Sequence, residues 1–167
     1  YYNADFTTGY NQSINITVSG SNEFGQSFND TWNIDEYLKH LYEMPTDWPM
    51  EALKAQAIAA RSYALSYTGG GSGSICPSQK CQVVKKELNN SRWQEAVDAT
   101  KGIVMTSGGS PIKAWYSSTH GGYAYSSSDI GWNATSWTKR LVDTTGSVNS
   151  FSDLINNAYD RSSSIFY

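Results

Sequence analysis

Glu43 is the residue of this sequence that first suggests acid–base chemistry. It stands in Tyr42-Glu43-Met44-Pro45, where a predicted helix breaks before a proline. A carboxyl group beside Tyr42, Met44 and Trp48 would be partly desolvated, which raises its pKa and suits a general acid. The alternative is a solvated glutamate at the end of a helix, because glutamates are mostly exposed to water.

Lys54 and Arg61 form a second candidate group. They lie seven residues apart in a stretch of helix formers, so they share one face of the helix. Cations on a buried helix require partners. They could bracket a substrate or orient an acidic residue. Alternatively they form structural ion pairs, with Glu51 or Asp47 at helical spacing from Lys54.

Two cysteines, Cys76 and Cys81, leave three interpretations open. They can close a disulfide, supply two zinc ligands or remain thiols. A zinc site would need two more ligands, and the only histidines are His40 and His120. A nucleophilic cysteine with His120 as its base would be a cysteine hydrolase, but no local signature of a cysteine protease accompanies it.

The segment 117–123 is a further candidate, because its glycines allow backbone to approach a ligand closely. A tight turn with an exposed His120 is the alternative. Aromatic residues crowd this half of the chain and would suit stacking on sugar rings, although several must belong to the core. They are Trp93, Trp115, Tyr116, Tyr123, Tyr125, Trp132 and Trp137.

The elements that must position these residues begin with an alternating strand over 13–20 and a second strand over 24–32. Periodic apolar residues predict a helix over 34–42. The strongest helical pattern covers 46–67, with Thr46 and Asp47 as competent N-caps and Pro49 in the first turn. Its many alanines indicate a buried central helix.

Further along, Ser91 is predicted to cap a helix over 92–101 that ends at Gly102. Strands over 103–106 and 112–117 should form a hairpin, and a short helix should follow over 151–159. Helices and strands mix without βαβ regularity, so we predict one α+β domain over 1–167, with β-hairpins and a substrate cleft.

Composition excludes several classes of protein. The net charge of -3 leaves no basic surplus for a nucleic acid partner. The sequence holds no apolar run long enough for a transmembrane helix and no signal peptide in its first thirty residues. Only 16% of residues are charged, against about 25% in ordinary soluble domains. The low charge and the many Ser, Thr, Asn, Tyr and Trp residues suit an extracytoplasmic protein that handles glycans.

Several segments together resemble the SpoIID/LytB family of stage II sporulation protein D and amidase-enhancer proteins. The resemblance covers about residues 13–145. It rests most strongly on Glu-Met-Pro at 43–45 and on the Trp-Pro-Met-Glu-Ala-Leu-Lys-Ala-Gln-Ala run of 48–57, continued by Ala-Ala-Arg-Ser-Tyr-Ala at 59–64. Weaker matches cover 76–83, 96–102 and 114–123.

The resemblance implies action on peptidoglycan as a lytic transglycosylase that cuts the glycan between muramoyl and glucosaminyl units, with a preference for peptide-stripped strands. The family's catalytic acid/base falls on Glu43. Its important Lys, Arg and Tyr fall on Lys54, Arg61 and Tyr116. The final motif adds further candidates for substrate binding, namely Ser117, Thr119, His120, Gly121, Gly122 and Tyr123.

Where family members bind zinc through two cysteines and a preceding histidine, this chain has Lys80, which favours a disulfide and no cofactor. His120 replaces a residue that is usually small, and Ser128-Asp129-Ile130-Gly131-Trp132 departs from the family's acidic-Val-Trp pattern. A second function stays open, because some members enhance a partner cell-wall amidase or only bind glycan.

Overall fold

The computed structural model describes residues 4–117 and 122–157. The chain divides into two compact units, a larger one over Asp5–Trp115 and a smaller one formed by Tyr1–Ala4 and Tyr116–Tyr167. The predicted single domain over 1–167 stays a prediction, and each unit is described by itself. Helices and sheets are mixed in the described part, which confirms the α+β class. The predicted substrate cleft stays a prediction.

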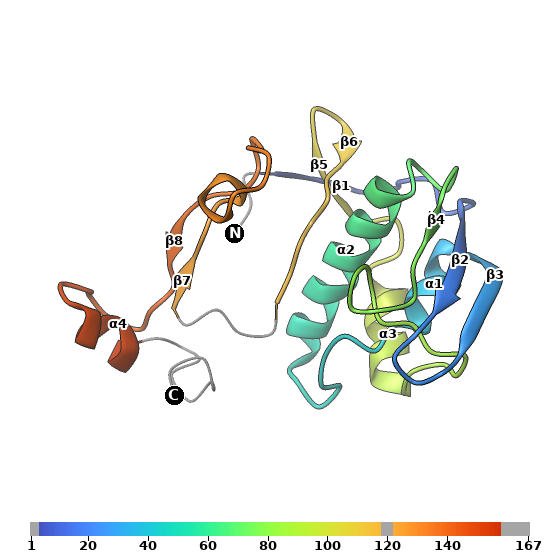
Figure 1. Cartoon of the computed structure of the whole chain (residues 1–167), viewed down its shortest axis with the longest axis horizontal. Helices are drawn as coiled ribbons and strands as arrows, with labels where there is room; N and C mark the ends of the chain where they lie inside the picture. Colours follow the sequence, from blue (N-terminus) through green and yellow to red (C-terminus); the bar gives the residue numbers. More distant parts are fainter. Residues whose placement is uncertain (1–3, 118–121, 158–167) are drawn as a thin grey trace. The chain divides into compact units, whose positions relative to one another are not determined.

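The larger unit is built around helix α2, Met50–Tyr67, as the alanine-rich pattern predicts. Ala57, Ala60 and Ala64 are fully buried, so neighbouring backbone can approach the helix closely. Helices α1 (Ile34–Lys39) and α3 (Ser91–Ala99) pack beside it (Figure 1). Trp93 of α3 is buried as well, and its indole Nε1 donates to the Leu38 carbonyl at 2.7 Å, which ties α3 to α1.

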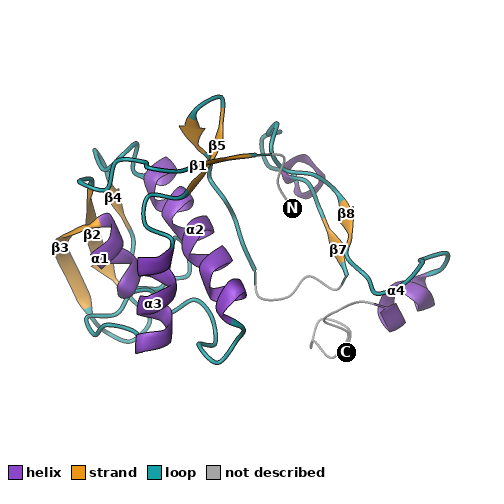
Figure 2. Cartoon of the chain, turned by 180° about the vertical axis from the view of Figure 1, so that it is seen from behind, coloured by secondary structure: helices purple, strands orange, loops and turns teal. Residues whose placement is uncertain are grey.

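Two small sheets complete this unit (Figure 2). Strands β2 (Asn15–Ser21) and β3 (Ser27–Asn33) correspond to the strands predicted over 13–20 and 24–32 and pair antiparallel, and β4 (Ser74–Ile75) pairs parallel to β2. The other sheet has the order β1-β5-β6, with strands at Asp5–Thr7, Val104–Ser107 and Ser110–Pro111. Gly108 and Gly109, both at positive φ, form the turn between β5 and β6, where a hairpin was predicted. Its second strand lies at Ser110–Pro111, before the predicted 112–117, so that strand prediction is wrong: residues 112–117 form no strand.

In the smaller unit, as far as it is described, β7 (Tyr123–Ala124) pairs antiparallel with β8 (Leu141–Val142). A 3₁₀ helix, η1, covers Ser127–Ile130, and helix α4 covers Phe151–Asn157. The predicted tail helix over 151–159 is thus confirmed as far as the described residues reach. Within those residues, no helix of either unit is long and apolar enough to cross a bilayer.

Helix ends differ from the prediction at three places. Helix α2 has Pro49 as its N-cap residue and no side-chain cap, so Thr46 and Asp47 do not cap it. Asn90, one residue before the predicted Ser91, caps α3 by accepting from the Trp93 N–H. Helix α1 stops at Lys39 instead of continuing to 42, because the backbone of 40–42 bonds to 83–85. A pairing with residues forty positions away therefore decides where α1 ends.

Candidate functional site

Glu43 lies where the pairing of residues 40–42 with residues 83–85 ends. Leu41 bridges to Val84, and the Tyr42 N–H donates to the Val83 carbonyl at 2.9 Å. The Glu43 side chain then continues the ladder in place of backbone, because its Oε1 accepts the Val83 N–H. The carboxyl group is half-buried and is fixed at one oxygen. Its other oxygen has no hydrogen-bond partner within the part of the chain that the structure describes.

This environment raises the pKa of the Glu43 carboxyl above its ordinary value. Burial is the largest cause, and the negative charge of Glu23 adds to it, while the Val83 N–H opposes both. Tyr63 of α2 is a further neighbour, since burial first, then Tyr67, then Glu43 raise the pKa of its phenol. A carboxyl group that keeps its proton to higher pH than usual can act as a general acid.

The Val83 N–H is itself held in place by the loop 76–84. Cys76 and Cys81 are joined by a disulfide, with their Cα atoms 5.5 Å apart. Within the loop, the Val84 N–H donates to the Pro77 carbonyl at 3.1 Å. Gln82 is fully buried and donates to the Ala60 carbonyl of α2 at 3.2 Å. The loop is thus clamped at its disulfide and at the central helix, and it presents one N–H to Glu43.

These cysteines do not fit a zinc site in this structure, because their sulfurs are bonded to each other. Position 80, where a histidine would serve as a ligand, holds a lysine. No group of three or more His, Cys, Asp or Glu residues in the described part could hold a metal ion. The prediction that the protein needs no cofactor remains to be tested.

Lys54 and Arg61 turn out to have different surroundings although they share one helix. Lys54 has a side chain that is 33% exposed and pairs with Glu51 one turn away, at 2.7 Å. This is one of the two ion pairs weighed from the sequence. A pair of this kind at a surface is readily exchanged with other partners. Lys54 therefore remains accessible to a substrate.

Arg61 is only 2% exposed, so a glycan strand cannot reach it in this structure. Its Nη2 donates to Asp35 at 3.0 Å and to the Val97 carbonyl at 3.2 Å. Its Nη1 donates to the Ile103 carbonyl at 3.2 Å and to Thr100 at 3.3 Å. The guanidinium therefore ties α1, α3 and the start of β5 to α2. This placement favours the structural ion pair over substrate contact.

The loop that follows Glu43 is fastened to the start of α3. Arg92 donates from Nε to the Thr46 carbonyl at 2.9 Å and from Nη2 to the Trp48 carbonyl at 2.8 Å. Asn90 donates to the Thr46 hydroxyl as well. These contacts fix the chain between Glu43 and the first turn of α2. They explain how two parts of one sequence motif, 43–45 and 48–64, keep a set relation to each other.

Comparisons with known proteins identify this segment. Residues 25–107 match the model of the SpoIID family, described as stage II sporulation protein. The chain belongs to the SpoIID family. The matched residues begin in the turn between β2 and β3 and end with β5, so this SpoIID segment lies within the larger unit and contains Glu43 and the disulfide.

Two relatives of the SpoIID segment are informative. The amidase enhancer of Bacillus subtilis (strain 168) is 41% identical over 93 residues, which are 56% of this chain and 13% of the relative. An uncharacterised protein of Brachyspira hyodysenteriae is 34% identical over 132 residues, which are 69% of this chain and 36% of the relative. The chain thus spans well under half the length of either relative.

The remaining predicted residues lie beyond the SpoIID segment, in the smaller unit. Tyr116 is half-buried and Ser117 is exposed. The Gly122 carbonyl accepts from the Asp143 N–H at 2.8 Å, and Tyr123 meets Tyr125 edge to face, with ring centroids 4.8 Å apart. Thr119, His120 and Gly121 lie outside the described residues. Their predicted role in substrate binding, like that of Tyr116, stays a prediction.

Sequence reasoning missed two neighbours of Glu43, one inside the SpoIID segment and one just before it. Tyr63 stands two residues after Arg61 within the motif, and an aromatic residue at such a position is more typical of a core than of a site. Glu23 lies twenty residues before Glu43, in the turn between β2 and β3. Its position in a hairpin turn predicts exposure but not a neighbour. Only the fold brings its charge close to Glu43.

Proposed function

We propose that the protein acts on bacterial cell-wall peptidoglycan, outside the cytoplasm, as a lytic transglycosylase with Glu43 as its single acid/base. The observation that carries the proposal is the half-buried Glu43 carboxyl, fixed at one oxygen by the Val83 N–H and raised in pKa. Membership in the SpoIID family, the name of the Bacillus relative and a disulfide, which persists in oxidising compartments, support the cell-wall setting.

The hydrogen bond from Val83 determines which oxygen of Glu43 would carry the proton. Because the N–H donates to Oε1, that oxygen serves as an acceptor and the acidic proton resides on Oε2. In the first step Oε2–H gives its proton to the glycosidic oxygen between a muramoyl C1 and the next glucosaminyl unit. The C1–O bond breaks, and positive charge develops at C1 and the ring oxygen.

In the second step the Glu43 carboxylate acts as the base. It takes the proton from the C6 hydroxyl of the same muramoyl unit while that oxygen bonds to C1. The products are a 1,6-anhydro sugar and a new glucosaminyl end, and Glu43 has its proton again. No water is consumed, so one carboxyl group suffices where most glycosidases need two.

Other residues take supporting roles in this proposal. Lys54 is accessible enough to bind an acidic or amide group of the muramoyl side chain. Arg61 holds the helices together from inside, and the disulfide loop holds the N–H that orients Glu43. The family resemblance places an important Tyr at Tyr116, and we assign it the stabilisation of developing charge.

Mass spectrometry of digested glycan tests the proposal. Peptide-stripped peptidoglycan is incubated with the wild type, with Glu43→Gln and with Glu95→Gln, a control glutamate that is exposed on α3. Removing a general acid should lower the rate by about 10²- to 10⁴-fold, and the control should keep wild-type activity. Anhydromuramoyl ends from the wild type and the control alone would support the mechanism. Reducing ends would mean hydrolysis and would exclude the single-carboxyl route.

A second candidate function is enhancement of a cell-wall amidase, which the printed name of the Bacillus subtilis relative favours. In that case the protein binds glycan without cutting it and raises the activity of a partner. This function would be favoured if Glu43→Gln stimulated the amidase as strongly as the wild type does. The wild type should then also leave the length of the glycan chains unchanged.

A further inference from the structure

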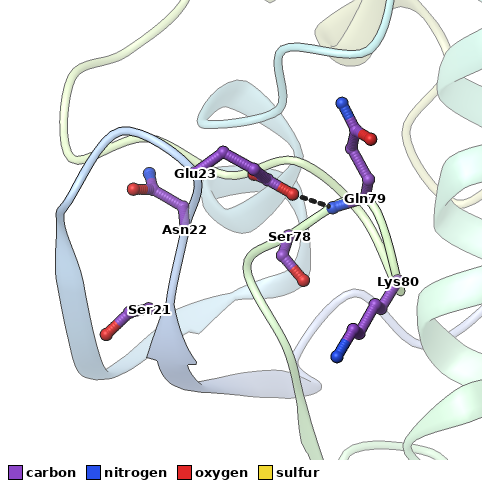
Figure 3. Close-up of a pocket in the computed structure, with 6 residues that line it drawn as sticks. All are labelled: Ser21, Asn22, Glu23, Ser78, Gln79 and Lys80. Atoms are coloured by element: carbon purple, nitrogen blue, oxygen red, sulfur yellow. Dashed lines mark hydrogen bonds between the residues drawn. The ribbon is translucent and has the colours of Figure 1, made fainter.

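A pocket of polar residues lies between the β2–β3 turn and the disulfide loop (Figure 3). One wall comes from the end of β2 and the following turn, and the other from residues inside the loop that the disulfide closes. The residues that line it are Ser21, Asn22, Glu23, Ser78, Gln79 and Lys80. Each of them carries a hydroxyl, amide, carboxyl or ammonium group, so the pocket suits a ligand rich in hydrogen-bonding groups.

Two opposite charges line this pocket without pairing. Glu23 accepts the Gln79 N–H at 2.7 Å, as the dashed line in Figure 3 marks. Lys80 is exposed, and neither an ion pair nor a hydrogen bond links its ammonium to any residue that the structure describes. The second oxygen of Glu23 is equally unoccupied within that part of the chain. The pocket therefore offers a strong acceptor and a strong donor together.

Asn22 has a different part in the same pocket. It is 8% exposed, and its amide donates to the Val84 carbonyl at 2.8 Å and to Gln26 at 2.9 Å. Its Oδ1 accepts from the Phe24 and Gln26 N–H groups. With these contacts Asn22 fixes the turn against the loop. It thereby sets the place of Glu23, its neighbour in the chain.

The pocket and Glu43 are connected through one short loop. Gln79 gives its N–H to Glu23, and four residues later Val83 gives its N–H to Glu43. The charge of Glu23 is also close enough to contribute to the raised pKa of Glu43. A ligand in the pocket would therefore contact the same loop that orients the carboxyl group of the proposed chemistry.

We propose that this pocket is a subsite for one sugar unit of the glycan, in which Glu23 accepts hydroxyl or acetamido protons and Lys80 pairs with a free lactyl carboxylate. The proposal rests on the proposed action on peptidoglycan and adds the place and the residues that select the strand. A muramoyl unit without its peptide has such a carboxylate, whereas a muramoyl unit with its peptide has an amide there. Lys80 thus distinguishes the two kinds of strand by charge.

The affinity of the protein for intact glycan tests this subsite. In a Glu43→Gln background, which leaves the strand intact, affinity for peptide-stripped glycan is measured by calorimetry with Lys80→Gln, Glu23→Gln and Lys101→Gln. Lys101 is the matched control, because it is a surface lysine that pairs with Asp98 and does not line the pocket. Oligomers of N-acetylglucosamine, which lack the carboxylate, are the neutral probe. Thermal unfolding checks that each variant is folded.

Loss of one charge-assisted contact should weaken binding of stripped glycan about tenfold in Lys80→Gln, and added salt should weaken the parent more than this variant. The neutral oligomers should bind Lys80→Gln as they bind the parent, while Glu23→Gln should bind both probes more weakly. Lys101→Gln should match the parent throughout.

Equal affinities of Lys80→Gln and its parent, a similar loss in Lys101→Gln, or no binding by the parent would overturn the subsite. Cleavage by the wild type is measured separately. Cleavage with no effect at Lys80 refutes the pocket alone. A charge-dependent effect at Lys80 without cleavage refutes the transglycosylase alone.

Discussion

Asp35 and Glu43 are two acidic side chains that the larger unit withdraws from water in different ways. Asp35 is 7% exposed and faces a full positive charge, the Arg61 guanidinium at 3.0 Å. Glu43 is half-buried and meets only one N–H dipole and the negative charge of Glu23. A buried carboxylate whose charge is paired with a cation, like that of Asp35, stabilises the fold. A partly buried carboxyl group without a cation beside it in the described part of the chain, like that of Glu43, keeps its proton to higher pH and can donate it.

Removal of Arg61 should produce the largest effect on the fold. Breaking a buried pair by removing one partner leaves the other charge without compensation, so Arg61→Met should lower the free energy of unfolding by about 3–5 kcal/mol. The double variant Arg61→Met/Asp35→Leu should recover part of this loss. Urea unfolding measures both. If Arg61→Met had wild-type stability and no longer bound glycan, Arg61 would be a binding residue. The Asp35–Arg61 pair would then not be structural, as the comparison with Glu43 assumes.

Loss of the disulfide should have the next largest effect. It closes a short loop with a sequence separation of 5, for which loop-closure entropy gives about 2 kcal/mol. Cys76→Ala/Cys81→Ala should lose that much stability and also activity, because the Val83 N–H is no longer clamped against Glu43. Reduction of the wild type should reproduce both changes. A pair of cysteines whose loss costs nothing, or whose stabilising effect depends on added zinc, would contradict this account.

A smaller effect should follow from the pKa of Glu43. Since its folded pKa is raised, the folded protein binds more protons than the unfolded chain above the ordinary glutamate value, and its stability falls as pH rises through that window. Glu43→Gln has no such charge to bury, and its amide oxygen can still accept the Val83 N–H. The variant should therefore gain stability relative to the wild type from pH 4 to pH 8.

Unfolding free energies of the two proteins, measured across this range, decide the matter. The gap should be smallest at low pH, where both side chains are neutral, and should then grow to a plateau. A wild type that instead gains on the variant as pH rises would show that the site stabilises the carboxylate. Glu43 would then be a poor general acid.

The sequence predicted best those features of the fold that depend on neighbouring residues alone. Helix α2 lies within the predicted stretch 46–67 and ends at Tyr67 as predicted, because nearly every residue from Met50 onward favours helix. The end of α1 could not be predicted, since the helix stops where 40–42 bonds to 83–85. The same holds for the site. Glu43 stood out by its type and its setting, whereas its anchor is a backbone N–H, and a backbone N–H has no residue type that would reveal it.

Lys54 offers the smallest expected effect on stability and sharpens the comparison within one helix. Its partner Glu51 is 82% exposed, and an ion pair in water contributes about 0.5 kcal/mol or less, so Lys54→Met should unfold almost like the wild type. If Lys54 binds the muramoyl side chain, as proposed above, the affinity of Lys54→Met for stripped glycan should still fall several-fold. For Arg61→Met, by contrast, the main effect should be on the free energy of unfolding and not on glycan affinity. A Lys54 variant that keeps both stability and glycan affinity would leave Lys54 as an ordinary surface lysine, and glycan recognition would then depend on residues outside α2.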